Sequence, residues 1–323
     1  PDGMSYRWLL NSQNNEIANT IYKPLDSFLK APMLLIGGWW DPHLKGIIDL
    51  YTKSIIAGGD PELHIGPATH LEWWESAQDI HLKFFKTHLQ KESSTKIKNS
   101  CIKLWNISTE KWEGYWSKNE SYPKWGLQAD SDIIFRDCGG DLIQDKLGSG
   151  SVTFVSDPWR PVPSLGGHLS PIPGVIDRKS IDRRYDVAAF TSKQLTNNLA
   201  LQGIPEIILS VTADQEGYDL CAAFSIINKE GTNVHQISTG FLRKFTKEHN
   251  KKIKVTIRLQ PICIELKKGE KLRISISGSA WPAIGVNSGK RSRLSGPVTM
   301  NTPVTTISLL LEDAYLGISH LLS

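Results

Sequence analysis

The sequence predicts a chain of two parts: an α/β segment over residues 1–95, followed by an antiparallel β-sandwich or jelly roll over residues 96–323. The first part alternates two short apolar runs with two amphipathic helical patterns, which is typical of parallel strands covered by crossover helices. After residue 99 this pattern gives way to short alternating runs separated by turn residues, which favours an antiparallel sandwich. A length of 323 residues suits about two domains.

The α/β prediction depends on two strand-helix pairs. Residues 33–37 form a fully apolar run, and residues 44–56 then carry apolar side chains at the spacing of one helical face, up to Gly58 and Gly59. A second short run follows at residues 62–65, with Pro61 at its start, and residues 75–89 resume the helical spacing. The polar run 91–95 is a suitable boundary.

Two parallel strands cannot cover their own faces, so residues 1–95 are expected to complete a larger α/β domain. The polar stretch 1–30, with a possible short helix at 17–22, is interpreted as the end of a cap or insertion in that domain. Because the chain starts at Pro1 and its first elements resemble the middle of a domain, we expect a truncated, processed or split-gene product.

The second part is predicted from strands and turns rather than from any helix. Gly, Pro, Asn and Asp clusters separate the runs, and the Pro-rich passage 158–173 is expected to be a surface loop. The expected strands are 102–105, 152–155, 207–213, 221–227, 254–259, 271–276 and 303–311.

Composition excludes several classes of function. The chain has 37 Lys plus Arg against 33 Asp plus Glu, a small excess that is spread out, and the basic stretch 244–254 lacks the interleaved aromatics of a nucleic-acid site. No apolar run reaches the ~18 residues of a membrane span, and the first residues do not form a signal peptide. We therefore expect a soluble, cytoplasmic protein without nucleic-acid or membrane partners. The cysteines are scattered and are expected to be buried, reduced thiols: Cys101, Cys138, Cys221 and Cys263.

Asp41 and His70 are the candidate catalytic residues. Each follows a predicted strand, and 70 − 41 = 29 residues is the interval of one strand-helix-strand unit. Because neighbouring parallel strands end at the same edge of a sheet, the acid and the imidazole are expected to meet there, in the order acid then histidine of a Ser-His-Asp hydrolase. The alternative is a structural Asp-Pro turn and an unrelated loop histidine, and spacing alone does not decide between them.

An ordered series of short motifs runs through nearly the whole chain. It resembles the cocaine-esterase and X-prolyl dipeptidyl-peptidase (CocE/NonD) family of serine hydrolases. Gly38-Trp39-Trp40-Asp41 and Gly66-Pro67-Ala68-Thr69-His70 are similar to the motifs that carry the family's acid and histidine, with Ala68 in place of a usual tryptophan. Further matches are the segments 157–167, 183–192, 217–220, 240–243 and 272–287.

The resemblance implies the C-terminal fragment of an α/β-hydrolase domain, with the end of its cap, followed by a jelly-roll (galactose-binding-like) β-sandwich. It makes Asp41 the triad acid and His70 the general base. No cofactor and no metal are expected. The family's nucleophile lies in a Gly-x-Ser-Tyr-x-Gly elbow upstream of the cap. Ser5 imitates that elbow, but Trp8 stands at its second glycine, so the serine is expected outside this chain.

The expected activity is therefore ester, amide or X-prolyl hydrolysis through an acyl-enzyme, in partnership with the missing N-terminal half. The chain alone is expected to be inactive. The alternative is a non-catalytic carbohydrate- or protein-binding module, which an exposed aromatic row would favour. The candidates for that row are Trp105, Trp112, Trp116 and Trp125.

Other polar and aromatic residues are expected to be structural. The histidines and the acid that invite a metal site lack the His-Glu-x-x-His spacing that places two imidazoles on one helical face: His64, His70 and Glu72, or His81 and His88. Four tryptophans beside the acid and the histidine are expected to pack in a core or a domain interface: Trp39, Trp40, Trp73 and Trp74. In the jelly roll we expect structural hydrogen bonds at Asp186, Asp219 and Arg243.

Overall fold

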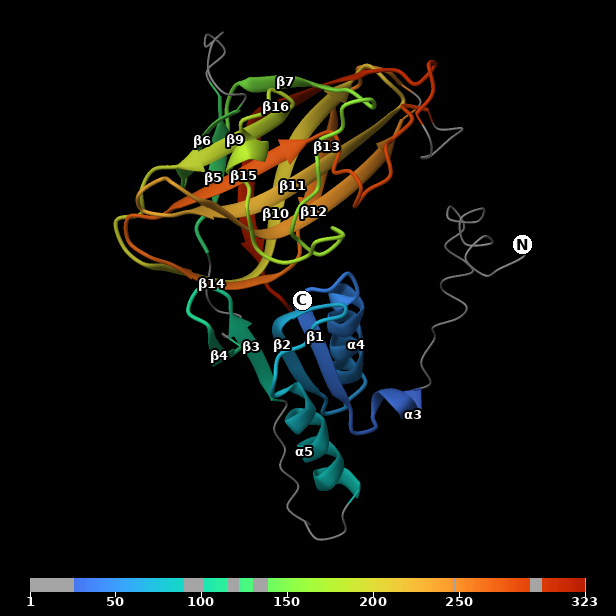
Figure 1. The fold of residues 1–323 in the computed structure, drawn as a ribbon, viewed down its shortest axis with the longest axis vertical. Coiled ribbons are helices and arrows are strands. Elements are labelled where there is room, and N and C mark those ends of the chain that lie inside the picture. The colour runs from blue at the N-terminus through green and yellow to red at the C-terminus, as the bar shows by residue number, and fades with distance from the viewer. Residues whose placement is uncertain are drawn as a thin grey trace, which may run out of the picture.

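A computed structural model describes residues 26–89, 101–115, 122–129, 139–246, 248–290 and 298–322. Within these ranges the protein has a small α/β sheet and a large β-sandwich, which lie at the bottom and top of Figure 1. The expectations for Ser5, the short helix 17–22, Trp116 and Cys138 fall outside the described residues.

The elements follow one another in the predicted order of α/β and then all-β. The helices are α3 (Asp26–Leu29), α4 (Leu44–Ile56), α5 (Ala77–Leu89) and α6 (Lys179–Asp182). The strands of the small sheet are β1 (Leu34–Trp40), β2 (Glu62–Thr69), β3 (Ile102–Asn106) and β4 (Lys111–Gly114). Those of the sandwich are β5 (Trp125–Gln128), β6 (Gly139–Gln144), β7 (Ser151–Ser156), β8 (Ile176–Asp177), β9 (Val187–Ser192), β10 (Leu199–Ala213), β11 (Gly217–Ile227), β12 (Val234–Phe245), β13 (Ile253–Arg258), β14 (Ile262–Leu266), β15 (Lys271–Ser277) and β16 (Thr305–Ser319).

The small sheet has four strands in the order β1-β2-β3-β4, which corrects the expectation of two strands. The segment 102–105 was expected in the sandwich, but β3 pairs in parallel with β2, with Leu63 opposite Ile102. β4 then adds an antiparallel edge. The assignment of 102–105 was wrong because an alternating sequence pattern predicts a strand but not the sheet that the strand joins. Long-range packing selects the partner strand.

The core of the small sheet confirms the periodicity of its first elements. Leu35, Leu63, Ile65 and Leu104 are buried on the strands, and α4 packs Leu44 onto them. α5 is different, because Ala77 is its one buried residue and Leu82, Phe85 and Leu89 are exposed. α5 therefore gains little stability from packing within the described residues.

The sandwich is almost entirely antiparallel, with β6 and β9 as a parallel pair. Its longest strands, β10 and β16, pair with each other, and β11 is buried at every position between β12 and β15. The strands predicted at 152–155, 207–213, 221–227, 254–259, 271–276 and 303–311 are confirmed, as is the irregular passage 158–173. No helix in the described ranges is long and apolar enough to cross a membrane.

Direct contacts join the sandwich to the end of β1. The side-chain amide of Gln260 donates to the carbonyl of Asp41 (3.1 Å), and the indole of Trp40 donates to the carbonyl of Ile237 (3.3 Å). Cys263 lies in the core of the small sheet, where its carbonyl accepts from the backbone of Ile107 (2.8 Å). The sandwich thus supports the strand end that carries the candidate acid.

The expectation of buried thiols is confirmed for two of the four cysteines. Cys221 and Cys263 are buried, whereas Cys101 is half-buried. Burial raises the pKa of the Cys263 thiol to about 12 and raises that of Cys221 as well. Both thiols are therefore protonated and unreactive at neutral pH.

Candidate active site

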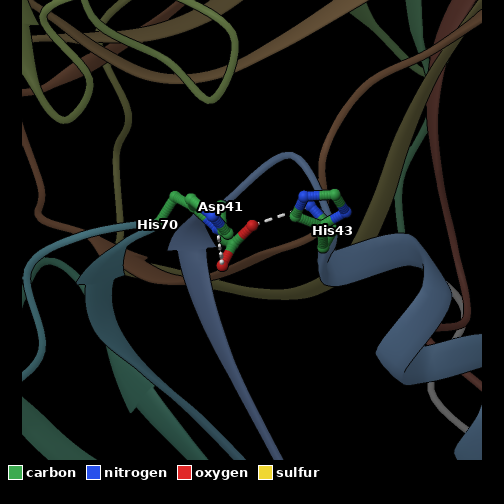
Figure 2. A group of neighbouring side chains, drawn as sticks. All are labelled: Asp41, His43 and His70. Carbon is green, nitrogen blue, oxygen red and sulfur yellow. Dashed lines mark hydrogen bonds and ion pairs between the residues drawn. The ribbon is translucent and has the colours of Figure 1, made fainter. Parts of the chain in front are cut away.

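The candidate site lies at the carboxyl ends of two neighbouring parallel strands. Trp40 is the last residue of β1 and faces Thr69, the last residue of β2. Asp41 directly follows β1 and His70 directly follows β2. The sheet therefore brings together two residues that are 29 positions apart in the sequence. Figure 2 shows both side chains above the strand ends.

A backbone N–H and the His70 ring contact the two oxygens of the Asp41 carboxylate. Asp41 is buried, and its Oδ1 accepts a hydrogen bond from the backbone N–H of His43 at 2.8 Å. The other oxygen, Oδ2, faces Nδ1 of His70 at 3.4 Å. This distance exceeds an ordinary N–H···O bond, as is common before substrate binds, when catalytic hydrogen bonds have not yet tightened.

His70 presents its ring to solvent. Its side chain is 58% exposed, against 9% for that of Asp41. A buried, fixed carboxylate behind an accessible imidazole is the arrangement that orients a histidine for proton transfer to a reactant on its open side. The prediction that these residues meet is therefore confirmed as geometry, while their catalytic role is a proposal.

Gly38 permits the close approach of the two strand ends. A Cβ on this residue would lie 2.3 Å from the carbonyl oxygen of Ala68 and 2.8 Å from its side chain. Ala68 itself is buried and occupies the position where the family usually has tryptophan. A small side chain at residue 68 thus fits against the glycine of β1, which explains how the local packing accommodates the difference.

The tryptophans near the site are mostly structural, as expected. Trp39 is buried and donates to the carbonyl of Trp105 at 2.8 Å, and Trp74 covers Gly66 and contacts Trp112 with ring centroids 5.3 Å apart. Trp73 is the exception, since 45% of its surface is exposed. It lies three residues after His70.

For the three candidate tryptophans that the structure describes, an exposed aromatic row is contradicted. Trp125 belongs to the sandwich core at 1% exposure. Trp105 and Trp112 are half-buried on the small sheet and pack edge to face at 5.5 Å. These three rings share no face of the sandwich, because the segment that carries two of them joins the other sheet.

His64 and Glu72, which were considered with His70 as metal ligands, do not belong to the group of three that the described residues form around His70. His64 lies 3.8 Å from Glu62, and burial lowers its pKa. Among the described residues, a set of three possible metal ligands does occur at Asp41, His43 and His70. His43 is absent from the candidates that the sequence suggested, although its place two residues after the candidate acid, directly before α4, is a usable signal.

The expected structural hydrogen bonds of the sandwich are present. Arg243 donates two bonds to Asp219 (2.8 and 2.7 Å), and Asn287 adds a third (2.7 Å). Asp219 is 1% exposed, so these bonds compensate a buried charge. Asp186 forms a more exposed pair with Arg184, whose pKa is raised by its hydrogen bond to Asp186.

His168 predicts an acid-sensitive fold. His168 lies in the irregular passage 158–173, and its Nδ1 contacts Oγ1 of Thr239 on β12 at 2.9 Å. Burial lowers the pKa of His168 from 6.5 to about 4. Because the unfolded chain binds more protons between these values, this stability is present above pH 6.5 and is lost as the pH falls towards 4. Between about pH 7 and pH 5, the free energy of unfolding should fall by about 2 kcal/mol less in His168→Gln than in the parent chain. Urea titrations at the two pH values measure this difference.

The control for this measurement is His249→Gln, which changes an exposed loop histidine. It should keep the pH dependence of the parent chain. Equal pH dependence in His168→Gln and the parent would contradict the assignment.

A strand pair that presents an acid and a histidine, followed by an antiparallel sandwich, defines an α/β hydrolase segment with an appended β domain. Family comparison agrees: residues 100–307 match the X-Pro dipeptidyl-peptidase C-terminal non-catalytic domain, and residues 2–72 match the X-Pro dipeptidyl-peptidase (S15 family). The chain belongs to the CocE/NonD and X-Pro dipeptidyl-peptidase S15 family of hydrolases.

Individual relatives are more distant. The cocaine esterase of Rhodococcus sp. (strain MB1 Bresler) is 24% identical over 229 aligned residues, and the match covers 63% of this chain and 39% of the esterase. An α-amino acid ester hydrolase structure aligns with a TM-score of 0.72 at 17% identity, over 91% of this chain and 57% of that one. An aminopeptidase from a marine sediment archaeon, Thaumarchaeota archaeon, gives 0.71 at 16% identity, over 91% and 56%.

These structural likenesses show the fold alone. The match covers 39% of the esterase's length, and the structural alignments cover 56–57% of the two solved chains, so the chain spans only part of these relatives.

Proposed function

We propose that the chain supplies the acid and the base of a serine hydrolase that cleaves ester or amide bonds through an acyl-enzyme. The observation that carries this proposal is the contact between His70 Nδ1 and Asp41 Oδ2 at 3.4 Å, at adjacent ends of parallel strands. Family membership supports it, and so does the description of one relative as an esterase. The domain division proposed with it keeps residues 1–95 in the hydrolase domain and adds β3 and β4 to them, since both pair within the small sheet, so the sandwich begins with β5.

In the proposed reaction, His70 takes the proton of a serine hydroxyl as that oxygen attacks the substrate carbonyl. The resulting imidazolium gives the proton to the departing alcohol or amine, which leaves an acyl-serine. Water then repeats the sequence, with His70 as base, and releases the acid. Asp41 holds the ring in the correct tautomer and stabilises its cation, a task that suits a carboxylate already fixed by the His43 N–H.

The nucleophile of this proposal comes from outside the 323 residues. The sequence contains no Gly-x-Ser-x-Gly segment, which is the strained turn that exposes a serine above an α/β sheet. The oxyanion donors beside that serine would come with it. Because these groups supply most of the transition-state stabilisation, we expect little activity from the chain alone.

Complementation tests the proposal. The chain is assayed alone and after mixing or coexpression with a segment that carries a family nucleophile elbow, against an ester, an amino-acid ester, an amide and an X-prolyl peptide. Activity only in the combination supports the proposal and identifies the substrate class. A folded combination that is inactive on the whole panel contradicts it.

A second candidate is a non-catalytic binding module. The observation in its favour is that the family model covering residues 100–307 describes a non-catalytic domain. A glycan array probed with the chain alone tests this function. Specific retention supports it, and retention of none of the glycans contradicts carbohydrate binding.

A further inference from the structure

Three potential metal ligands converge beside the candidate catalytic pair. Asp41 follows β1, His43 precedes α4 and His70 follows β2. Figure 2 shows the three side chains next to one another, with Asp41 between the two histidines in this view. Their ligand atoms all lie within 4.8 Å of one another. The His43 and His70 rings are 5.0 Å apart between centroids and are tilted by 53°.

These distances are close to those of a zinc site. Zinc binds imidazole nitrogen at ~2.0–2.1 Å and carboxylate oxygen at ~2.0–2.2 Å, so tetrahedral geometry places its ligand atoms roughly 3.4 Å apart. Asp41 Oδ2 and His70 Nδ1 already have a separation of 3.4 Å. The third ligand atom, a ring nitrogen of His43, lies within 4.8 Å of the other two. Both histidines are exposed, so their side chains are free to rotate and bring this nitrogen closer.

The chemistry of the three residues favours the same ion. Two neutral imidazoles and one carboxylate are a ligand set of zinc enzymes, in which a water molecule takes the fourth position. The Asp41 carboxylate is pre-organised, because its Oδ1 accepts a hydrogen bond from the His43 N–H, and its Oδ2 faces the His70 ring. The exposed side of the two rings provides the path of entry and the open fourth position.

We propose that Asp41, His43 and His70 form a binding site for a zinc ion. The bound ion occupies a lone pair of His70 and the carboxylate oxygen that faces it. If His70 is the base of a hydrolase, zinc therefore competes with proton transfer and acts as a reversible inhibitor. The metal site is independent of the proposed function, and only this inhibitory effect rests on it.

Calorimetric titration of the full chain with zinc chloride, in competition with a chelator of known affinity, tests the site. We expect one zinc per chain at this position. His43→Ala and His70→Ala should each weaken that binding at least about tenfold, because even groups that only support a ligand contribute 10–100-fold. Both residues are exposed, and an unchanged circular dichroism spectrum checks that the variants are folded.

The matched control is His81→Ala, which removes an exposed histidine from α5 and should leave the affinity unchanged. Cobalt supplies a second signal, since its four-coordinate complexes absorb visible light strongly and this band should disappear in His43→Ala. The proposal is overturned if the parent chain takes up no stoichiometric zinc, or if neither variant changes its affinity. Because the titration uses no substrate and no nucleophile, failure of the hydrolase proposal would not alter its result.

Discussion

Replacement of His70 by alanine is expected to lower kcat of the complemented hydrolase by about 10⁴- to 10⁶-fold, which is the range for loss of a triad base. The serine would then lose the group that accepts its proton and returns it to the leaving group. Steady-state hydrolysis of the ester found in the complementation panel measures the effect. KM should change far less than kcat, since the imidazole acts in the transition state.

Asp41→Asn is the companion variant, with an expected loss of about 10³- to 10⁴-fold. Its amide retains the size of the side chain but cannot stabilise the imidazolium, and it favours the wrong histidine tautomer. His81→Ala, an exposed change on α5, serves as the control for general damage. Full activity of the complemented hydrolase with His70→Ala would refute His70 as the base.

The second large effect is expected in the sandwich, where Asp182→Ala should lower the free energy of unfolding by about 3–5 kcal/mol. The Asp182 carboxylate is fully buried and accepts from Arg178 (2.8 Å), Ser275 (2.7 Å) and Arg273 (3.4 Å). Burial lowers the pKa of Arg178 and its contact with Asp182 raises it, so removal of the acid leaves an uncompensated buried cation. Urea unfolding followed by tryptophan fluorescence measures the loss.

Asp186→Ala provides a matched comparison, because it breaks another Arg-Asp pair close by in the sequence. Its side chains are 34% and 21% exposed, and its removal should cost less than about 1 kcal/mol. If the two variants lost equal stability, burial would not be the reason for the importance of Asp182. Gln236 also accepts from Arg178 (2.8 Å), which holds the guanidinium in position within the network.

Much of the candidate site could be predicted because its signals are local. An apolar run that ends in glycine and then an acid, and a second that ends in a histidine, report two strand ends without any knowledge of their neighbours. The interval of 29 residues between Asp41 and His70 then matches one crossover unit. Because consecutive parallel strands usually lie side by side with a right-handed connection, the two strand ends are expected next to each other. The tight fit of Gly38 against Ala68 refines this geometry without changing it.

The third and fourth strands of the small sheet could not be assigned in this way. β3 has the alternating pattern of a strand, but its pairing partner β2 ends more than thirty residues earlier, and no local pattern specifies that partner. The same holds for His43, whose type and position are visible in the sequence but whose ring meets His70 only after α4 and the loop beyond β2 are both in place.

By itself, the sequence determined the two-part architecture, the family and the pair Asp41 and His70, because each depends on periodicity, turn residues or motifs that act over short stretches. Tertiary structure alone decided that β3 and β4 extend the small sheet, that Gln260 of the sandwich supports the Asp41 carbonyl, and that His43 completes a set of three metal ligands. The physical reason is that burial patterns specify which face of an element is covered, whereas the covering partner is set by packing between distant segments.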